Sequence, residues 1–262
     1  MNNPSPDDVR HMARALQLAK RGLYTTDPNP RVGCVIVRDG LVVGEGWHRC
    51  AGEPHAEIHA LAAAGSQARG ATAYVTLEPC CHHGRTPPCS AALVRAGITR
   101  VVAAMPDPNP RVARQGIADL EKAGIRVDIG LLQAESERLN PGFISRMTRG
   151  RPYLRVKLAA SLDGRTALAN GESKWITGEA ARADVQRLRA RSSAILTGIG
   201  TVLADDPSLT VRDLDIDRQP LRVVVDPQLR MRPAARMLTL PGATLVVTSA
   251  EQANNAAALR AA

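Results

Sequence analysis

Apolar and polar residues in the first half of the chain alternate between the spacing of helices and that of strands. From Val9 to Lys20, apolar residues recur every three or four positions, which predicts an amphipathic helix capped by Asp7 or Asp8. The turn pair Asp39-Gly40 separates two short apolar runs and predicts a hairpin. Further helices are predicted at 55–64, 89–96, 112–123 and 133–139, and strands at 32–37, 41–46, 71–77, 100–105 and 125–129.

Strands that alternate with helices in this way are typical of a three-layer α/β/α domain. Pro141-Gly142 and the segment 149–152 interrupt the pattern, so we expect a first domain at 1–146 and a second at 147–262. The second domain begins a new α/β series that stops with its layers unfinished, and we expect it to lack its C-terminal part. Its strands are predicted at 153–160, 193–197, 221–225 and 244–248, and its helices at 178–190 and 251–261.

The composition indicates a globular, cytoplasmic protein with an anionic partner. Hydrophobic residues make up 44% of the 262 positions, and no apolar run approaches the roughly 20 residues that span a bilayer. The N-terminus has no apolar segment of the kind found in secretory signals. A formal net charge of +9 favours either nucleic acid or a phosphorylated small molecule. Only 2% of residues are aromatic, and single-strand binders stack bases on aromatic rings, so we expect the small molecule, no nucleic acid and no membrane partner.

The five cysteines favour metal binding or catalysis over disulfide bonds, because cytoplasmic thiols stay reduced and an odd number of cysteines cannot all pair. His55, Cys80 and Cys89 are of the types that bind Zn²⁺ and would leave a fourth position open for water. Glu57, two residues after the histidine, could shuttle a proton in the same pocket. Zinc nucleobase deaminases combine a His-x-Glu element with a later Pro-Cys element in this way.

Two features of this region leave alternatives open. Eight residues separate Cys80 from Cys89, and among them Cys81 or His83 could be a ligand instead. Cys34 and Cys50 are expected to be inert. The hexapeptide Asp-Pro-Asn-Pro-Arg-Val occurs at 27–32 and again at 107–112. It marks either two turns that lead into regular elements, or two turns whose asparagine amides serve one pocket.

Several of these motifs together resemble the RibD family of bifunctional riboflavin biosynthesis proteins. The resemblance rests on Pro54-His55-Ala56-Glu57, on the segment 76–89 with its long spacing between cysteines, and on the segments 157–165, 171–177 and 201–212. It implies a zinc-dependent, cytidine-deaminase-like domain followed by a dihydrofolate-reductase-like domain that uses NADPH. The implied substrate is 2,5-diamino-6-(5-phosphoribosylamino)pyrimidin-4(3H)-one. Its deamination would give 5-amino-6-(5-phosphoribosylamino)uracil, whose ribosyl group would then be reduced to ribityl.

The resemblance also implies a role for individual residues. His55, Cys80 and Cys89 would bind zinc, and Glu57 would be the catalytic proton donor. Substrate would be bound by Asn29, His82, His83, Asn109, Ser173, Arg189, Leu209 and Arg212. NADPH would be bound by Ala159, Trp175, Thr201, Asp205 and Pro227.

The chain departs from the family pattern after Thr248, where a substrate-binding glutamate and a glycine-rich NADP loop would follow in the family. We therefore expect this polypeptide to deaminate but not to reduce. A nucleic-acid deaminase of the tRNA-adenosine type, a deaminase-only protein and a structural zinc module are the alternatives. A structural site needs no acid such as Glu57, which speaks against the last of them. We also expect a homo-oligomer.

Overall fold

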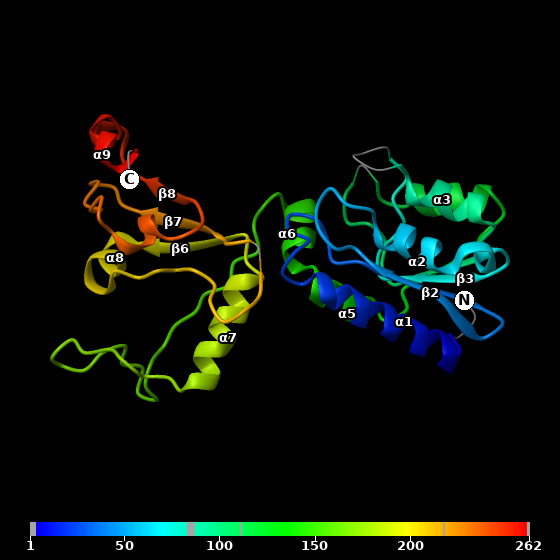
Figure 1. Ribbon diagram of the computed structural model, residues 1–262, viewed down its shortest axis with the longest axis horizontal. Coiled ribbons are helices and arrows are strands. Elements are labelled where there is room, and N and C mark those ends of the chain that lie inside the picture. Colours follow the sequence, from blue (N-terminus) through cyan, green and yellow to red (C-terminus); the bar gives the residue numbers. More distant parts are fainter. Residues whose placement is uncertain (1–3, 83–86, 111, 217, 261–262) are drawn as a thin grey trace. The chain divides into compact units, whose positions relative to one another are not determined.

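The computed structural model describes residues 4–82, 87–110, 112–216 and 218–260. The chain divides into two compact units, Met1–Arg155 and Val156–Ala262 (Figure 1). None of the described helices combines the length and the apolar character needed to cross a bilayer.

The first helix, α1, covers Pro6–Ala19 and is followed by a 3-10 turn, η1, at Lys20–Gly22. Its N-cap is Ser5, so the predicted cap at Asp7 or Asp8 is wrong. The Ser5 hydroxyl accepts a hydrogen bond from the Asp8 backbone N–H at 3.1 Å, and the Asp8 carboxylate accepts one from the Ser5 N–H at 3.0 Å. This reciprocal capping box requires Asp8 to be the third helical residue and places Pro6 in the first turn, where its missing N–H costs nothing.

A five-stranded sheet in the order β2-β1-β3-β4-β5 forms the middle of the first unit. Its strands are Gly33–Arg38 (β1), Leu41–Trp47 (β2), Thr72–Val75 (β3), Arg100–Ala103 (β4) and Arg126–Ile129 (β5). β1 is antiparallel to both neighbours, whereas β3, β4 and β5 are parallel. The predicted hairpin is confirmed, with Asp39 and Gly40 at φ values of 51° and 78° in its turn.

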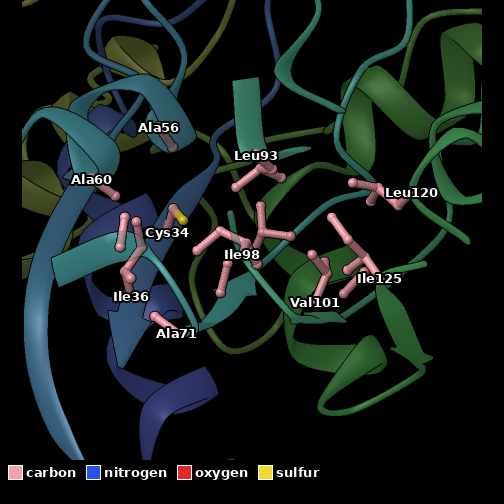
Figure 2. Packing of buried hydrophobic residues seen from close by; sticks show 14 of the residues in the cluster. Cys34, Ile36, Ala56, Ala60, Ala71, Leu93, Ile98, Val101, Leu120 and Ile125 are labelled. Carbon is pink, nitrogen blue, oxygen red and sulfur yellow. The ribbon is translucent and has the colours of Figure 1, made fainter. Parts of the chain in front are cut away.

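Helices cover both faces of this sheet, which confirms the predicted three-layer architecture (Figure 1). Val35 and Val37 of β1 point to the face that packs against α1, near α5 (Gln133–Leu139). Cys34 and Ile36 alternate with them and point to the other face, where they share a hydrophobic cluster with Ala56, Ala60 and Leu93 (Figure 2). That face is covered by α2 (Ala56–Ala64), its 3-10 extension η2 (Gly65–Ala68), α3 (Cys89–Ala96) and α4 (Gln115–Lys122).

Helix α2 lies directly on β2 because two residues of that strand are glycines. A Cβ atom at Gly46 would lie 2.3 Å from the Ala56 carbonyl oxygen, and one at Gly44 would lie 2.2 Å from that of Ala60. Only glycine allows this approach of strand and helix backbones. This close packing fixes the distance between the start of α2 and the sheet.

Pro141-Gly142 begins a helix, α6 (Pro141–Arg149), instead of interrupting the pattern as predicted. Proline fits the first turn of a helix, and Phe143 and Ile144 pack against the hydrophobic core of the first unit. Gly150, at a φ of 63°, ends the helix.

The second unit contains a three-stranded parallel sheet in the order β6-β7-β8. Its elements are α7 (Glu179–Ala190), β6 (Ala194–Gly198), α8 (Ile199–Asp205), β7 (Leu221–Val225), η3 (Arg236–Thr239), β8 (Thr244–Val247), η4 (Ala250–Asn255) and α9 (Ala257–Arg260). Ile199 and Val202 of α8 pack with Val224 of β7 and with Met237 to form its core.

Two predictions for this unit are wrong. Residues 153–160 form no strand, and the side chains of Leu154, Val156 and Leu158 are about four-fifths exposed. An extended segment becomes a strand only when another strand pairs with it, and no described strand does so here. The predicted helix at 251–261 is a 3-10 segment followed by the short α9, because Asn254 and Asn255 favour turns over helix interiors.

A buried ion pair ties α1 to the sheet. The Asp8 carboxylate accepts hydrogen bonds from Arg100 at 2.7 Å and from the Tyr74 hydroxyl at 2.7 Å, and Arg100 also donates to Asp128 at 2.7 Å. Burial raises the pKa of Asp8, but the hydrogen bonds from Arg100 and Tyr74 outweigh it and hold this pKa well below its ordinary value of 3.8.

We expect Asp8→Asn to lower the free energy of unfolding by about 2 kcal/mol at pH 7, because Arg100 loses one of its two anionic partners. A carboxyl whose pKa is lowered on folding stabilises the protein above its unfolded pKa and loses this effect as the pH falls. The difference between wild type and variant should therefore shrink below about pH 4. Urea unfolding at pH 7 and pH 3 measures it. Asp7→Asn, at an exposed ion pair with Arg10, is the matched control and should change little; equal losses in the two variants would contradict the prediction.

Candidate functional site

Three side chains with metal-binding atoms meet beside the sheet of the first unit. His55 is the N-cap residue of α2, Cys89 is the first residue of α3, and Cys80 lies on the loop that follows β3. The His55 Nδ1 atom lies 3.5 Å from the Cys80 Sγ and 3.4 Å from the Cys89 Sγ, and the three donor atoms lie within 4.8 Å of one another. One nitrogen and two sulfurs at this spacing suit a tetrahedral Zn²⁺ and leave a fourth position for another ligand.

The other candidate ligands are not part of this cluster. The Cys81 thiol points instead to the Gln115 side-chain oxygen, at 3.7 Å. Cys34 is fully buried in β1, and Cys50 is partly exposed. His83 lies outside the described residues.

The backbone around Cys80 favours its thiolate form. The Cys80 Sγ accepts a hydrogen bond from the Cys89 N–H at 3.4 Å, at the positively polarised N-terminus of α3. The hydrogen bond from the Cys89 thiol, opposed by burial and helped by His55, lowers the pKa of the Cys80 thiol. The local geometry therefore prepares Cys80 for binding a cation.

Glu57 lies in the first turn of α2, one helical position after the start, and is 3% exposed. It lines the same cavity as His55 and Cys80. Burial, and then the nearby Cys80, raise the pKa of Glu57 to about 7. A carboxyl group in this state can both accept and donate a proton near neutral pH.

A cavity of about 470 Å³ opens beside these residues. It receives Asn29 from the turn before β1, His82 from the loop after β3 and Asn109 from the loop after β4. The two repeated Asp-Pro-Asn-Pro segments thus come together at one cavity. β3 lies between β1, which is antiparallel to it, and β4, which is parallel to it. The segment before β1 and the segment after β4 therefore lie at the same end of the sheet.

Asn29 is held in place by a buried histidine that the sequence did not single out. The His48 Nε2 atom lies 3.0 Å from the Asn29 Nδ2, and its Nδ1 lies 3.2 Å from the Pro54 carbonyl oxygen. The His48 ring also meets the His55 ring edge to face, with centroids 5.3 Å apart. Asn29 is therefore fixed relative to a candidate metal ligand.

Helix α6 contributes a wall of the cavity through Phe143, Arg146 and Met147. Sequence reasoning missed these residues because it treated Pro141-Gly142 as a break. Proline in the first turn followed by apolar residues is the signal that could have identified the helix.

The second unit has a cavity of about 680 Å³ that gathers most of the residues expected to bind there. The expected residues that line it are Ala159, Ser173, Trp175, Arg189, Asp205 and Arg212. Thr201, Leu209 and Pro227 do not line it. Thr201 lies on α8 after β6 and Pro227 lies two residues after the end of β7, so both stand at the carboxyl edge of this parallel sheet. Leu209 packs against the core of the unit.

Two arginines give this second cavity a positive character. Arg189 donates a hydrogen bond to the Thr210 carbonyl at 3.0 Å, and burial together with the nearby Arg212 lowers the pKa of its guanidinium. In the described part of the unit, no ion pair joins either arginine to an acid. Two neighbouring cations in this setting favour a bound anion such as a phosphate.

Both halves of the chain match known protein families. Residues 5–105 match the cytidine and deoxycytidylate deaminase zinc-binding region, and residues 152–259 match the RibD C-terminal domain. The chain is 60% identical over 249 residues to the riboflavin biosynthesis protein RibD of Escherichia coli, a match that covers 90% of this chain and 68% of that protein. It is 53% identical over 257 residues to RibD of Haemophilus influenzae, covering 94% and 69%.

Solved structures give the same result. Acinetobacter baumannii RibD superposes with a TM-score of 0.90 at 55% identity, over 94% of this chain and 70% of that one. A Thermotoga maritima protein described as a diaminohydroxyphosphoribosylaminopyrimidine deaminase/5-amino-6-(5-phosphoribosylamino)uracil reductase superposes with a TM-score of 0.88 at 42% identity, over 94% and 71%. The zinc-type cluster, the two-unit fold and these matches together show that the chain belongs to the RibD family of riboflavin biosynthesis proteins.

Proposed function

We propose that the chain deaminates 2,5-diamino-6-(5-phosphoribosylamino)pyrimidin-4(3H)-one to 5-amino-6-(5-phosphoribosylamino)uracil. The observation that carries this proposal is the meeting of His55, Cys80 and Cys89 with Glu57 at one cavity. Residues 1–146 are assigned to this activity. The proposal includes a cytoplasmic location and a homo-oligomer.

The donor set fits Zn²⁺, because it offers one imidazole and two thiols at tetrahedral spacing. Zinc held by these residues supplies a Lewis acid and makes water reactive at neutral pH. The described cavity leaves space for a pyrimidine beside this cluster.

The protein's own groups handle the proton. Water adds to the ring carbon that carries the 2-amino group, and ammonia leaves, so the carbon–nitrogen bond is replaced by a carbon–oxygen bond. Glu57 transfers the two protons of the attacking water in turn, the first to the ring nitrogen next to the attacked carbon and the second to the amino nitrogen, which leaves as ammonia. Asn29, His82, His83 and Asn109 hold the pyrimidine or its phosphate.

We assign the second half, residues 147–262, to reduction of the ribosyl group of the deaminated product to ribityl, with a hydride from NADPH. Ser173, Arg189, Leu209 and Arg212 bind the substrate, and the two arginines take its phosphate. Ala159, Trp175, Thr201, Asp205 and Pro227 bind NADPH.

The deciding experiment follows ammonia release and NADPH oxidation by the purified 262-residue chain, with zinc measured on the same sample. Ammonia release from the diaminopyrimidine supports the first assignment, and its absence from zinc-loaded protein refutes it. NADPH consumption with the deaminated product supports the second assignment, and its absence refutes it.

Arg189→Gln should lower the affinity for ribose 5-phosphate about tenfold, because one of the two charge-assisted contacts to the phosphate is lost. Isothermal titration calorimetry measures the affinity. Arg187→Gln is the matched control, since Arg187 lies on the same helix, is exposed and pairs with Asp184 at 4.0 Å. If both variants bind as tightly as wild type, the assignment of Arg189 is wrong.

A further inference from the structure

Glu78 is a buried carboxylate that neither the metal cluster nor the proposed chemistry uses. It is 3% exposed and lies on the loop after β3, two residues before Cys80. Its Oε2 atom accepts hydrogen bonds from the backbone N–H groups of Asp107 at 2.9 Å and Arg114 at 3.0 Å. Its Oε1 atom accepts from those of Gly116 at 3.0 Å and Ile117 at 3.3 Å.

These four donors lie on both sides of the loop that carries Asn109. Asp107 lies four residues after the end of β4, whereas Gly116 and Ile117 belong to the first turn of α4. Within the loop, the Asn109 N–H donates to the Asp107 carboxylate at 2.8 Å. One carboxylate therefore holds both ends of the segment that brings Asn109 to the cavity.

Helix α4 lies very close to the backbone that carries this carboxylate. A Cβ atom at Gly116 would lie 1.9 Å from the Pro79 carbonyl oxygen. The first turn of α4 thus touches the backbone next to Glu78, and glycine is needed there.

Glu78 lies at the cavity, yet its oxygens are already occupied. An ionised carboxylate has about four lone-pair sites, and four N–H donors fill them. It has no acceptor left for a substrate group, and its effect on the reaction must pass through the loop that it holds.

We propose that Glu78 is a positioning residue of the deaminase site, which fixes the segments 107–110 and 112–117 so that Asn109 meets the substrate. This inference rests on the proposed function of the cavity. Glu78 touches neither the reacting atoms nor the metal, and its contribution is to substrate binding.

Glu78→Gln tests the inference with little change of size. The amide oxygen can still accept two of the four hydrogen bonds, but the amide NH₂ group then faces the other two N–H donors. We expect KM for the diaminopyrimidine to rise about tenfold, with kcat within about twofold of wild type and zinc still bound. Glu121→Gln, on the exposed side of α4, is the matched control and should leave both constants unchanged. A fall in kcat or zinc content with an unchanged KM would overturn the proposal.

A double-mutant cycle shows whether Glu78 acts through Asn109. If it does, Glu78→Gln combined with Asn109→Ala should have the KM of Asn109→Ala alone. If the two factors multiply, Glu78 acts by another route and the proposal is wrong. An active wild type in which Asn109→Ala raises KM but Glu78→Gln does not would overturn this inference alone, whereas an inactive zinc-loaded wild type would overturn the proposed function.

Hydrogen exchange gives a readout that needs no activity. In zinc-loaded Glu78→Gln, the amides of Asp107, Arg114, Gly116 and Ile117 should exchange at least about tenfold faster than in wild type, while those of β3 should not. Unchanged exchange at all four would overturn the proposal. If Glu78→Gln does not fold, Gly116→Ala tests the same contact, because the added Cβ must push α4 away from Pro79. A KM equal to that of wild type in folded Gly116→Ala would also count against it.

Discussion

Glu57→Gln is expected to reduce ammonia release by a factor of about 10²–10⁴ while zinc remains bound. The glutamine has nearly the shape of the buried glutamate but cannot take a proton from water or give one to the leaving nitrogen. His55, Cys80 and Cys89 keep their geometry, because Glu57 is not one of the three clustered donors.

The measurement is a steady-state ammonia assay together with zinc analysis of the same sample. Glu121→Gln, the same chemical change at an exposed position of α4, is the control. Unchanged turnover in Glu57→Gln would refute the role of the glutamate as proton carrier. Loss of zinc together with activity would instead make it part of the metal site.

Cys80→Ser is expected to lose most of its zinc and, with it, ammonia release, because a serine hydroxyl is a poor ligand compared with a thiolate. The neighbouring Cys81→Ser is a matched control at the next position of the chain, since the Cys81 thiol points to Gln115 and not to His55. It should keep zinc and activity.

Metal analysis by mass spectrometry and the ammonia assay measure both variants. A chelator should abolish the activity of wild type, and added Zn²⁺ should restore it. If Cys81→Ser loses zinc and Cys80→Ser retains it, the ligand assignment is reversed.

Local sequence patterns were sufficient to predict most helices and strands of the first unit, because the interactions that form these elements are between residues close together in the chain. The pattern at 89–96 predicted α3, which ends at the left-handed Gly97, because helix periodicity and a glycine cap involve only neighbouring residues. The composition of the segment 153–160 predicts a strand just as clearly as the pattern at 89–96 predicts a helix, yet this segment forms no strand. Pairing depends on a distant segment, and local preference cannot supply one.

The candidate site likewise has features that local sequence predicts and features that depend on the fold. His55, Glu57, Cys80 and Cys89 were predicted, because residue type and short spacing already identify zinc chemistry. The choice between Cys80 and Cys81 could not be made from spacing, because adjacent side chains point in different directions and only the fold shows which one faces His55.

The sequence by itself determined most helices and strands of the first unit, with α6 as the exception, the chemistry of the zinc-type donors and the resemblance to a family. Only the tertiary structure decided which residues surround that chemistry. His48 behind Asn29, the wall from α6 and the four N–H groups around Glu78 are contacts between segments far apart in the chain. Such contacts arise when the sheet brings loop ends together and burial forces polar groups to find partners, and neither leaves a periodic trace in the sequence.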